Sequence, residues 1–178
     1  MGHMVKGALG AFVVHLIGFA ICFGTTAWLT SVYEDASDKV KVLGDGSAAP
    51  ESDVLLALGD ARAAMLNWLL AIFVIGFICA LLFLLRSANA KAAVPEQQEA
   101  LKPMWVILLL GLFGLGVGLW LAMLYAPGAA FAMEGGHYAQ ILSLSFALLL
   151  LSYFASTLLF VKPLLAPSVP LAPLIRRL

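Results

Sequence analysis

The sequence is poor in charge. Lys, Arg, Asp and Glu together make up 11% of its 178 residues, whereas a soluble globular domain carries roughly 25%. The ten basic and ten acidic side chains cancel to a net charge of zero, so no overall positive field attracts nucleic acid. Because 63% of the residues are hydrophobic, we predict an all-α integral membrane protein.

Groups that carry chemistry are also scarce. The sequence has no Cys-x-x-Cys pair, no His-Glu-x-x-His metal motif, no nucleophile elbow and no phosphate-binding glycine loop. Its two cysteines, Cys22 and Cys79, lie in apolar runs, where a thiol behaves as a small hydrophobe. No acidic residue interrupts these runs, which removes the usual carriers of protons or cations in transporters. We therefore expect a protein that is not an enzyme and has no intrinsic cofactor or metal.

Long apolar runs dominate what is present. Each is close to the roughly 20 residues with which a helix crosses a hydrocarbon core. They cover residues 7–29, 62–85, 104–126 and 138–161. The sequence therefore predicts a four-helix transmembrane bundle over residues 1–161, followed by a separate tail over residues 162–178.

Basic residues mark one side of this predicted bundle. They are Lys6, Arg86, Lys91, Lys102, Lys162, Arg176 and Arg177. Since positive charge is retained on the cytoplasmic side, we expect both termini and an inner loop at about 87–103 to be cytoplasmic, or on the matrix side of an organelle. A larger acidic loop, at about 30–61, lies on the opposite side. A bacterial or organellar inner membrane fits this pattern best.

Aromatic residues with a polar edge stand near the predicted helix ends. Such side chains commonly anchor helices at the membrane surface. The residues are Trp28, Tyr33, Trp68, Trp105, Tyr125 and Tyr138. We predict that they are interface anchors.

The first apolar run carries a stripe of small and polar residues. Ala11, His15, Gly18, Cys22 and Thr25 are spaced by four, three, four and three positions, which places them on one helix face. In lipid, helices associate through close packing of small residues and through hydrogen bonds. We therefore predict that this face packs against another helix.

The other runs carry packing candidates as well. Gly114 and Gly118 form a Gly-x-x-x-Gly motif with Gly111 on the same side, and such motifs let a second helix approach closely. On the fourth run, the hydroxyls of one face can bond their own helix or a neighbour; they belong to Ser145, Ser152 and Ser156. On the second run, the amide of Asn67 requires a hydrogen-bond partner within the membrane.

His15 is the candidate cofactor-binding residue. It stands nine residues after Lys6, which at a rise of 1.5 Å per residue puts it roughly 13 Å into the membrane. It could serve as a haem ligand, a hydrogen-bond donor to a quinone or a proton relay. A second haem ligand at the same depth is lacking, because His3 and His137 stand near opposite surfaces. We predict that His15 is a neutral imidazole bonded to a neighbouring helix.

The tail has its own pattern. Pro167, Pro170 and Pro173 recur every three residues, the repeat of a polyproline II helix. The pattern predicts an extended apolar arm that docks on a partner or on the membrane surface. Arg176 and Arg177 would pair with acidic groups or lipid phosphates. The alternative is a disordered tail.

Two family resemblances concern short stretches. The four-helix plan, the larger first outer loop and "VVHLIGFAICFGTTAW", which ends at Trp28, resemble the claudin and peripheral myelin protein superfamily. That family has a Gly-Leu-Trp motif and a cysteine pair in its first loop, whereas here the loop has no cysteine and the motif occurs at residues 118–120. "RAAMLN" at 62–67 is similar to the glutathione and eicosanoid membrane enzymes, but Leu70 replaces the acidic residue expected there. We adopt neither resemblance.

These observations lead to a noncatalytic prediction. We expect an accessory or structural subunit of a larger membrane complex, for example a respiratory or photosynthetic one, with other integral subunits and lipids as partners. A homo-oligomer is also compatible with the helix faces. The first alternative is a quinone- or haem-binding membrane anchor of a redox enzyme. The second is a claudin-like adhesion or channel-modulating protein.

Overall fold

The computed structural model describes residues 2–35, 51–90, 95–124 and 135–161, together with residues 165, 168 and 169. It is all-helical over these ranges. The helices are α1 (Gly2–Asp35), α2 (Glu51–Asn89), α3 (Pro95–Leu124) and α5 (Gly135–Phe160). By length and composition, all four are long and apolar enough to cross a membrane, which confirms the predicted all-helical class and the four predicted spans; the sides on which the termini and the acidic loop lie stay predictions.

The helices extend beyond their apolar segments. The segments run over Met4–Trp28, Arg62–Asn89, Glu99–Ala122 and Ala139–Phe160. The largest extension precedes the second segment, because α2 already begins at Glu51. Helix α1 continues to Asp35, so the connection between the two helices is shorter than the loop predicted at 30–61.

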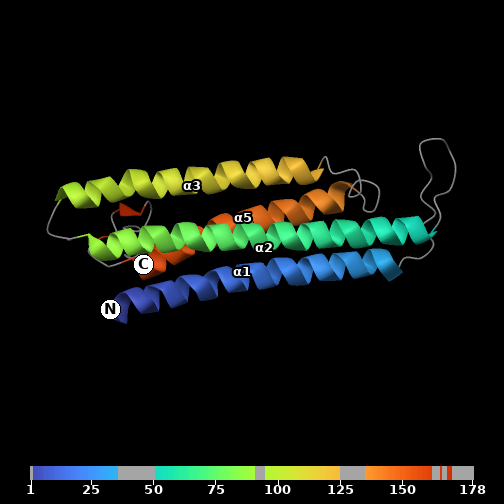
Figure 1. Cartoon of the computed structure of the whole chain (residues 1–178), viewed down its shortest axis with the longest axis horizontal. Coiled ribbons are helices and arrows are strands. Elements are labelled where there is room, and N and C mark those ends of the chain that lie inside the picture. The colour runs from blue at the N-terminus through green and yellow to red at the C-terminus, as the bar shows by residue number, and fades with distance from the viewer. Residues whose placement is uncertain are drawn as a thin grey trace.

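The helices run alternately up and down along one long axis (Figure 1). Helices α2 and α5 occupy the middle of the bundle and contact each other. Helices α1 and α3 lie on opposite sides of this pair, and each packs against both α2 and α5. Because the four described helices alternate in direction, α1 begins and α5 ends at the same end of the bundle.

Two clusters of buried side chains form the core. One includes Trp68 and lies in the half of the bundle where α1 ends. The other includes Trp105 and lies in the half where α1 begins. Trp68 and Trp105 are 5% and 4% exposed, so these two predicted interface anchors are core residues. The apolar body of each indole is covered by neighbouring helices, whereas the Trp28 side chain is 64% exposed.

The described residues of the tail pack against the bundle. Leu165 and Val169 are fully buried in the cluster around Trp105. Leu165 and Ser168 each have 3₁₀ geometry, and the Ser168 hydroxyl donates to the Leu165 carbonyl at 2.5 Å. These three described residues do not test the extended arm predicted over residues 162–178, which stays a prediction. Pro167, Pro170, Pro173, Arg176 and Arg177 lie outside the described residues.

Candidate functional site

A polar seam joins α1 to α5. It is formed by His15, Gly18 and Cys22 of α1 and by Ser145, Ser152 and Ser156 of α5. All six residues are buried, although both helices are otherwise rich in exposed apolar side chains. The two stripes noted in the sequence therefore face each other along one interface.

The residues of the polar seam pair in antiparallel register. His15 lies opposite Ser156, with 3.3 Å between Nδ1 and the hydroxyl oxygen. A side-chain carbon added at Gly18 would lie 2.6 Å from the Ser152 Oγ and 2.7 Å from a Phe73 ring carbon. The Cys22 thiol is within hydrogen-bonding reach of Ser145. Close approach at Gly18 thus holds the two polar pairs together.

The tautomer of His15 follows from its hydrogen bonds. Nδ1 lies 2.9 Å from the Ala11 carbonyl oxygen, one turn earlier in α1. A carbonyl oxygen only accepts hydrogen bonds, so Nδ1 carries the proton and donates it. The same N–H also points to the Ser156 hydroxyl oxygen, which accepts the longer arm of a bifurcated hydrogen bond. His15 is therefore bonded mainly to its own helix and more weakly to α5.

The other ring nitrogen of His15 is an unused acceptor. Nε2 is buried and has no hydrogen-bond partner among the described residues. It faces Gly76 of α2, where an added side-chain carbon would lie 3.3 Å away. The Phe77 ring meets the imidazole edge-on, with centroids 6.0 Å apart. With the proton on Nδ1, the Nε2 lone pair accepts a hydrogen bond but cannot donate one.

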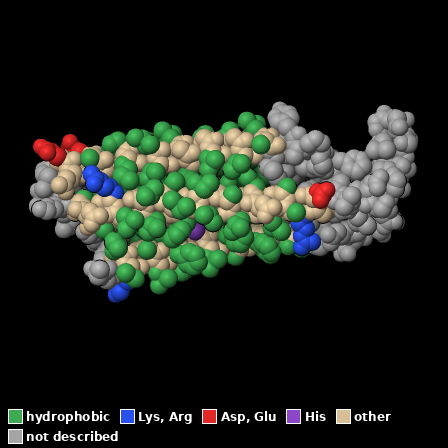
Figure 2. All heavy atoms as spheres, viewed as in Figure 1, with side chains coloured by type: hydrophobic (Ala, Val, Ile, Leu, Met, Phe, Trp, Pro, Cys, Tyr) green, Lys and Arg blue, Asp and Glu red, His purple; other side chains and the backbone are tan. Residues whose placement is uncertain are grey.

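An apolar groove of about 170 Å³ lies beside the imidazole, between α1 and α2. Four phenylalanine rings line it, from Phe12, Phe19, Phe73 and Phe77, and the remaining lining is aliphatic except for His15. In Figure 2, a small purple patch of histidine is visible among green hydrophobic side chains on this face of the bundle. We call this feature the phenylalanine groove.

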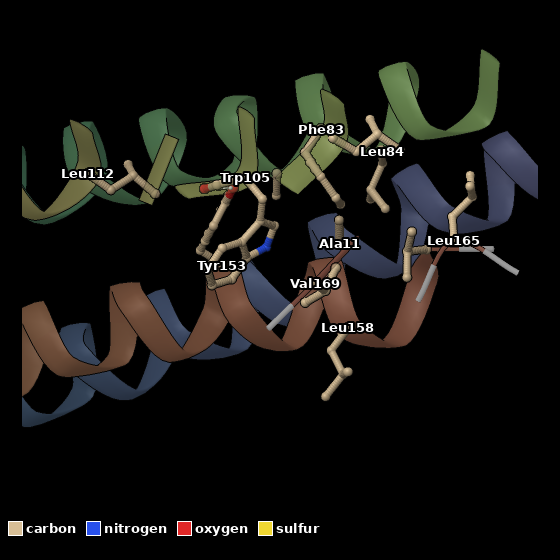
Figure 3. Close-up of a cluster of buried hydrophobic side chains, with 12 residues drawn as sticks. Ala11, Phe83, Leu84, Trp105, Leu112, Tyr153, Leu158, Leu165 and Val169 are labelled. Atoms are coloured by element: carbon tan, nitrogen blue, oxygen red, sulfur yellow. Dashed lines mark hydrogen bonds between the residues drawn. The ribbon is translucent and has the colours of Figure 1, made fainter. Parts of the chain in front are cut away.

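A second polar cluster attaches α3 to α5. The Trp105 Nε1–H donates to the Thr157 hydroxyl at 2.9 Å, and the Tyr153 hydroxyl donates to the Trp105 carbonyl at 3.2 Å. The Thr157 hydroxyl in turn donates to carbonyls of its own helix, at 3.0 Å from Tyr153 and Phe154. The rings of Trp105 and Tyr153 lie side by side, with centroids 5.6 Å apart (Figure 3). The indole is thereby fixed inside the bundle.

The predicted packing glycines of α3 face outward. Gly111, Gly114 and Gly118 are exposed, and a side-chain carbon added at any of them would meet no described atom within 4 Å. We call them the α3 glycine face. Gly116, which the sequence reasoning did not select, is buried and would place an added carbon against the Phe146 ring. Within the described chain, α3 therefore packs through Gly116.

Two further predicted packing residues lie near the surface of the bundle. Asn67 is exposed on α2. Thr25 is partly buried, and its hydroxyl donates to the Ile21 carbonyl of its own helix at 2.8 Å. Neither residue takes part in the polar seam.

Residues that the sequence reasoning missed are small or stand beside selected ones. Gly76 is buried against His15 and Leu149, and it forms a small-x-x-x-small pair with the fully buried Ala80. That spacing is a helix-packing signal that could have been found. Thr157 stands next to Ser156 and so falls off the serine stripe. Its role depends on Trp105, which is far away in the sequence.

The described residues offer little to a metal or haem. They contain no group of three or more His, Cys, Asp or Glu side chains that could hold a metal ion. The phenylalanine groove is smaller than the roughly 300–1,000 Å³ of typical ligand pockets. The site therefore combines a tight interhelical seam with a small apolar groove and one hydrogen-bond acceptor.

Comparison with known proteins provides no relative, since no family model, curated protein or solved structure matches the chain.

Proposed function

We propose that this chain is a noncatalytic accessory subunit of a larger membrane complex, and that it binds a transmembrane helix of another subunit through the α3 glycine face. The observation that carries the proposal is the exposure of Gly111, Gly114 and Gly118 on one side of an apolar helix. Glycine costs about 1 kcal/mol relative to alanine inside a helix. Packing against a neighbouring backbone offsets this cost in membranes.

The position of α3 in the bundle supports the same proposal. Helix α3 lies at one side of the α2–α5 pair (Figure 1), and its apolar segment is the least buried of the four. Large side chains such as Ile107, Leu110 and Phe113 stand outward beside the glycines. A partner helix would pack its own side chains between these residues and against the glycine backbone.

Charge supports an orientation. The end of the bundle where α1 begins carries Lys6, Arg86 and Lys102 beside Glu96 and Glu99. The opposite helix ends are mainly acidic in sequence. They include one basic residue, Arg62, and the acidic residues Glu34, Asp35, Glu51, Asp53 and Asp60. We propose that the first end is on the cytoplasmic or matrix side of a bacterial or organellar inner membrane. The proline-rich residues after 169 remain a proposed second contact with the partner.

The experiment extracts the membrane in a mild detergent and measures the mass and protein composition of the particle that contains this chain. It compares wild type with two variants. Wild type is expected in a large particle of fixed composition, and the double variant Gly114→Leu/Gly118→Leu in a smaller one. Gly24→Leu is the matched control, because Gly24 of α1 is also exposed with no described atom within 4 Å of an added side-chain carbon. The control should assemble normally.

The result that contradicts the proposal is equally concrete. If wild type migrates as a small particle of this chain alone, the accessory role is lost. If the double variant assembles as well as wild type, the α3 glycine face is not the contact.

The alternatives have weaker support. A haem-binding anchor needs more space than the phenylalanine groove provides and a further ligand beside His15, the only histidine with a described side chain. The claudin-like alternative depends on the outer loop predicted at 30–61, of which residues 36–50 lie outside the described residues. We therefore retain the accessory subunit as the proposed function.

A further inference from the structure

We propose that the phenylalanine groove binds a membrane-soluble phenol or quinol, whose hydroxyl group donates a hydrogen bond to Nε2 of His15. This site is separate from the α3 glycine face and does not depend on the proposed function. Two independent observations meet there: an apolar groove between α1 and α2, and a buried acceptor on its lining residue that has no partner in the described chain.

The direction of the hydrogen bond selects the ligand. The Ala11 carbonyl keeps the proton on Nδ1, so Nε2 presents a lone pair. A ligand that offers only carbonyl oxygens, such as a quinone or an ester, has nothing to donate to it. A hydroxyl group does, and it would satisfy an acceptor that costs about 1–3 kcal/mol when it is buried unpaired.

The phenylalanine rings and the volume of the groove favour a ligand with a single aromatic ring. Pairs among the aromatic side chains of the groove are already arranged edge to face, with centroids 5.8 Å apart for Phe12 and Phe77 and 6.1 Å for Phe19 and Phe73. Another ring gains most in that arrangement. An apolar cavity of roughly 150 Å³ is enough to hold benzene, and this groove measures about 170 Å³. A porphyrin is far larger.

The hydroxyl group would reach Nε2 past the Phe77 ring. The Gly76 side of Nε2 is filled instead by Leu149, whose methyl carbon would lie 2.5 Å from a β-carbon added at Gly76. The Phe77 ring is only partly buried. A rotamer change that turns this ring toward the lipid would open the way to Nε2.

The test measures thermal unfolding of the full chain in detergent with added para-hexylphenol or its methyl ether. The ether carries a methyl group in place of the hydroxyl proton and therefore cannot donate a hydrogen bond. We expect the phenol to bind wild type about three- to tenfold more tightly than the ether, the effect of one net hydrogen bond. In His15→Leu this difference should vanish. Leu151→Ala, at an exposed position of α5 that lies outside the groove, should retain it.

A second measurement does not depend on a variant that folds. Nitrogen NMR of histidine-labelled wild type reports the protonation and bonding of each ring nitrogen. Nε2 should be unprotonated and should shift on addition of the phenol but not of the ether. Equal binding of the two probes, a preference that persists in His15→Leu, or an Nε2 signal that the phenol leaves unchanged would each overturn the proposal. The last result would assign the acceptor to a tightly held water.

Discussion

Two helices of this protein carry small residues at helix-packing spacing, and they use them in opposite ways. On α1, Gly18 is buried so closely that an added side-chain carbon would meet both Ser152 and Phe73. On α3, a side-chain carbon added at Gly114 or Gly118 would meet no atom of another described helix within 4 Å. The two motifs look alike in the sequence, but only the first holds this bundle together. A small-residue stripe therefore indicates that a helix face can be approached, and it does not say by which helix.

The difference follows from what surrounds the glycines. Gly18 of α1 lies between His15 and Cys22, whose polar atoms face serine hydroxyls of α5. The glycines of α3 stand among exposed apolar side chains, which gain nothing by turning inward from lipid. Helix α3 is attached instead by Trp105 and by close packing at Gly116. Substitutions in the two regions should therefore have very different effects on stability.

The largest expected effect is that of Gly18→Leu. The new side chain would collide with Ser152 and Phe73 and force α1 away from both neighbours. Overpacking of a close-packed core costs about 1–3 kcal/mol and sometimes more, and a whole leucine side chain should reach the upper limit. The measurement is the free energy of unfolding in detergent. A loss below 1 kcal/mol would show that the α1–α5 interface is looser than described.

The next effect is that of Thr157→Val, which removes the acceptor for the Trp105 indole. The buried N–H would be left unpaired, so we expect a loss of about 1–3 kcal/mol. Thr25→Val is the control, because the Thr25 hydroxyl bonds only its own helix in the described contacts. Equal losses in the two variants would argue against Trp105 as the attachment of α3.

Ser156→Ala should have a smaller effect. His15 keeps its shorter bond to Ala11, and only the 3.3 Å contact across the helices is lost. Interhelical hydrogen bonds in membranes contribute about 0.6 kcal/mol on average, and we expect a loss of that size. Ser143→Ala, at an exposed position of the same helix, provides the baseline. A loss as large as that of Thr157→Val would mean that hydrogen bonding, rather than close packing, holds the polar seam.

The smallest loss of stability is predicted for Gly114→Leu in the isolated chain. The position is open, so the free energy of unfolding should not fall, and removal of a glycine from the helix interior should raise it by up to about 1 kcal/mol. Compared with Gly18→Leu, this substitution is the direct test of the contrast between the two helices. A large loss of stability would mean that α3 uses this face within the chain after all.

The sequence predicted the helices well and their partners less well. Four apolar runs specify four helices because a spanning segment must satisfy its own backbone hydrogen bonds. The stripe through His15 was visible from spacing alone. Its pairing with Ser156 was not, because periodicity reports which residues share a face but not which face lies opposite. Trp105 shows the same limit: its position suggests the membrane surface, while its hydrogen bond to Thr157 depends on the three-dimensional arrangement.

The pairing of α1 with α5 also has a consequence for biosynthesis. A ribosome delivers the helices in order, so α1 enters the membrane long before the helix that carries Ser145, Ser152 and Ser156. Until then, the α1 side of the polar seam has only α2 among these helices to cover it. The growing chain must therefore pass through a stage in which His15 and Gly18 are accessible to other components of the membrane. Completion of α5 ends that stage and closes the interface.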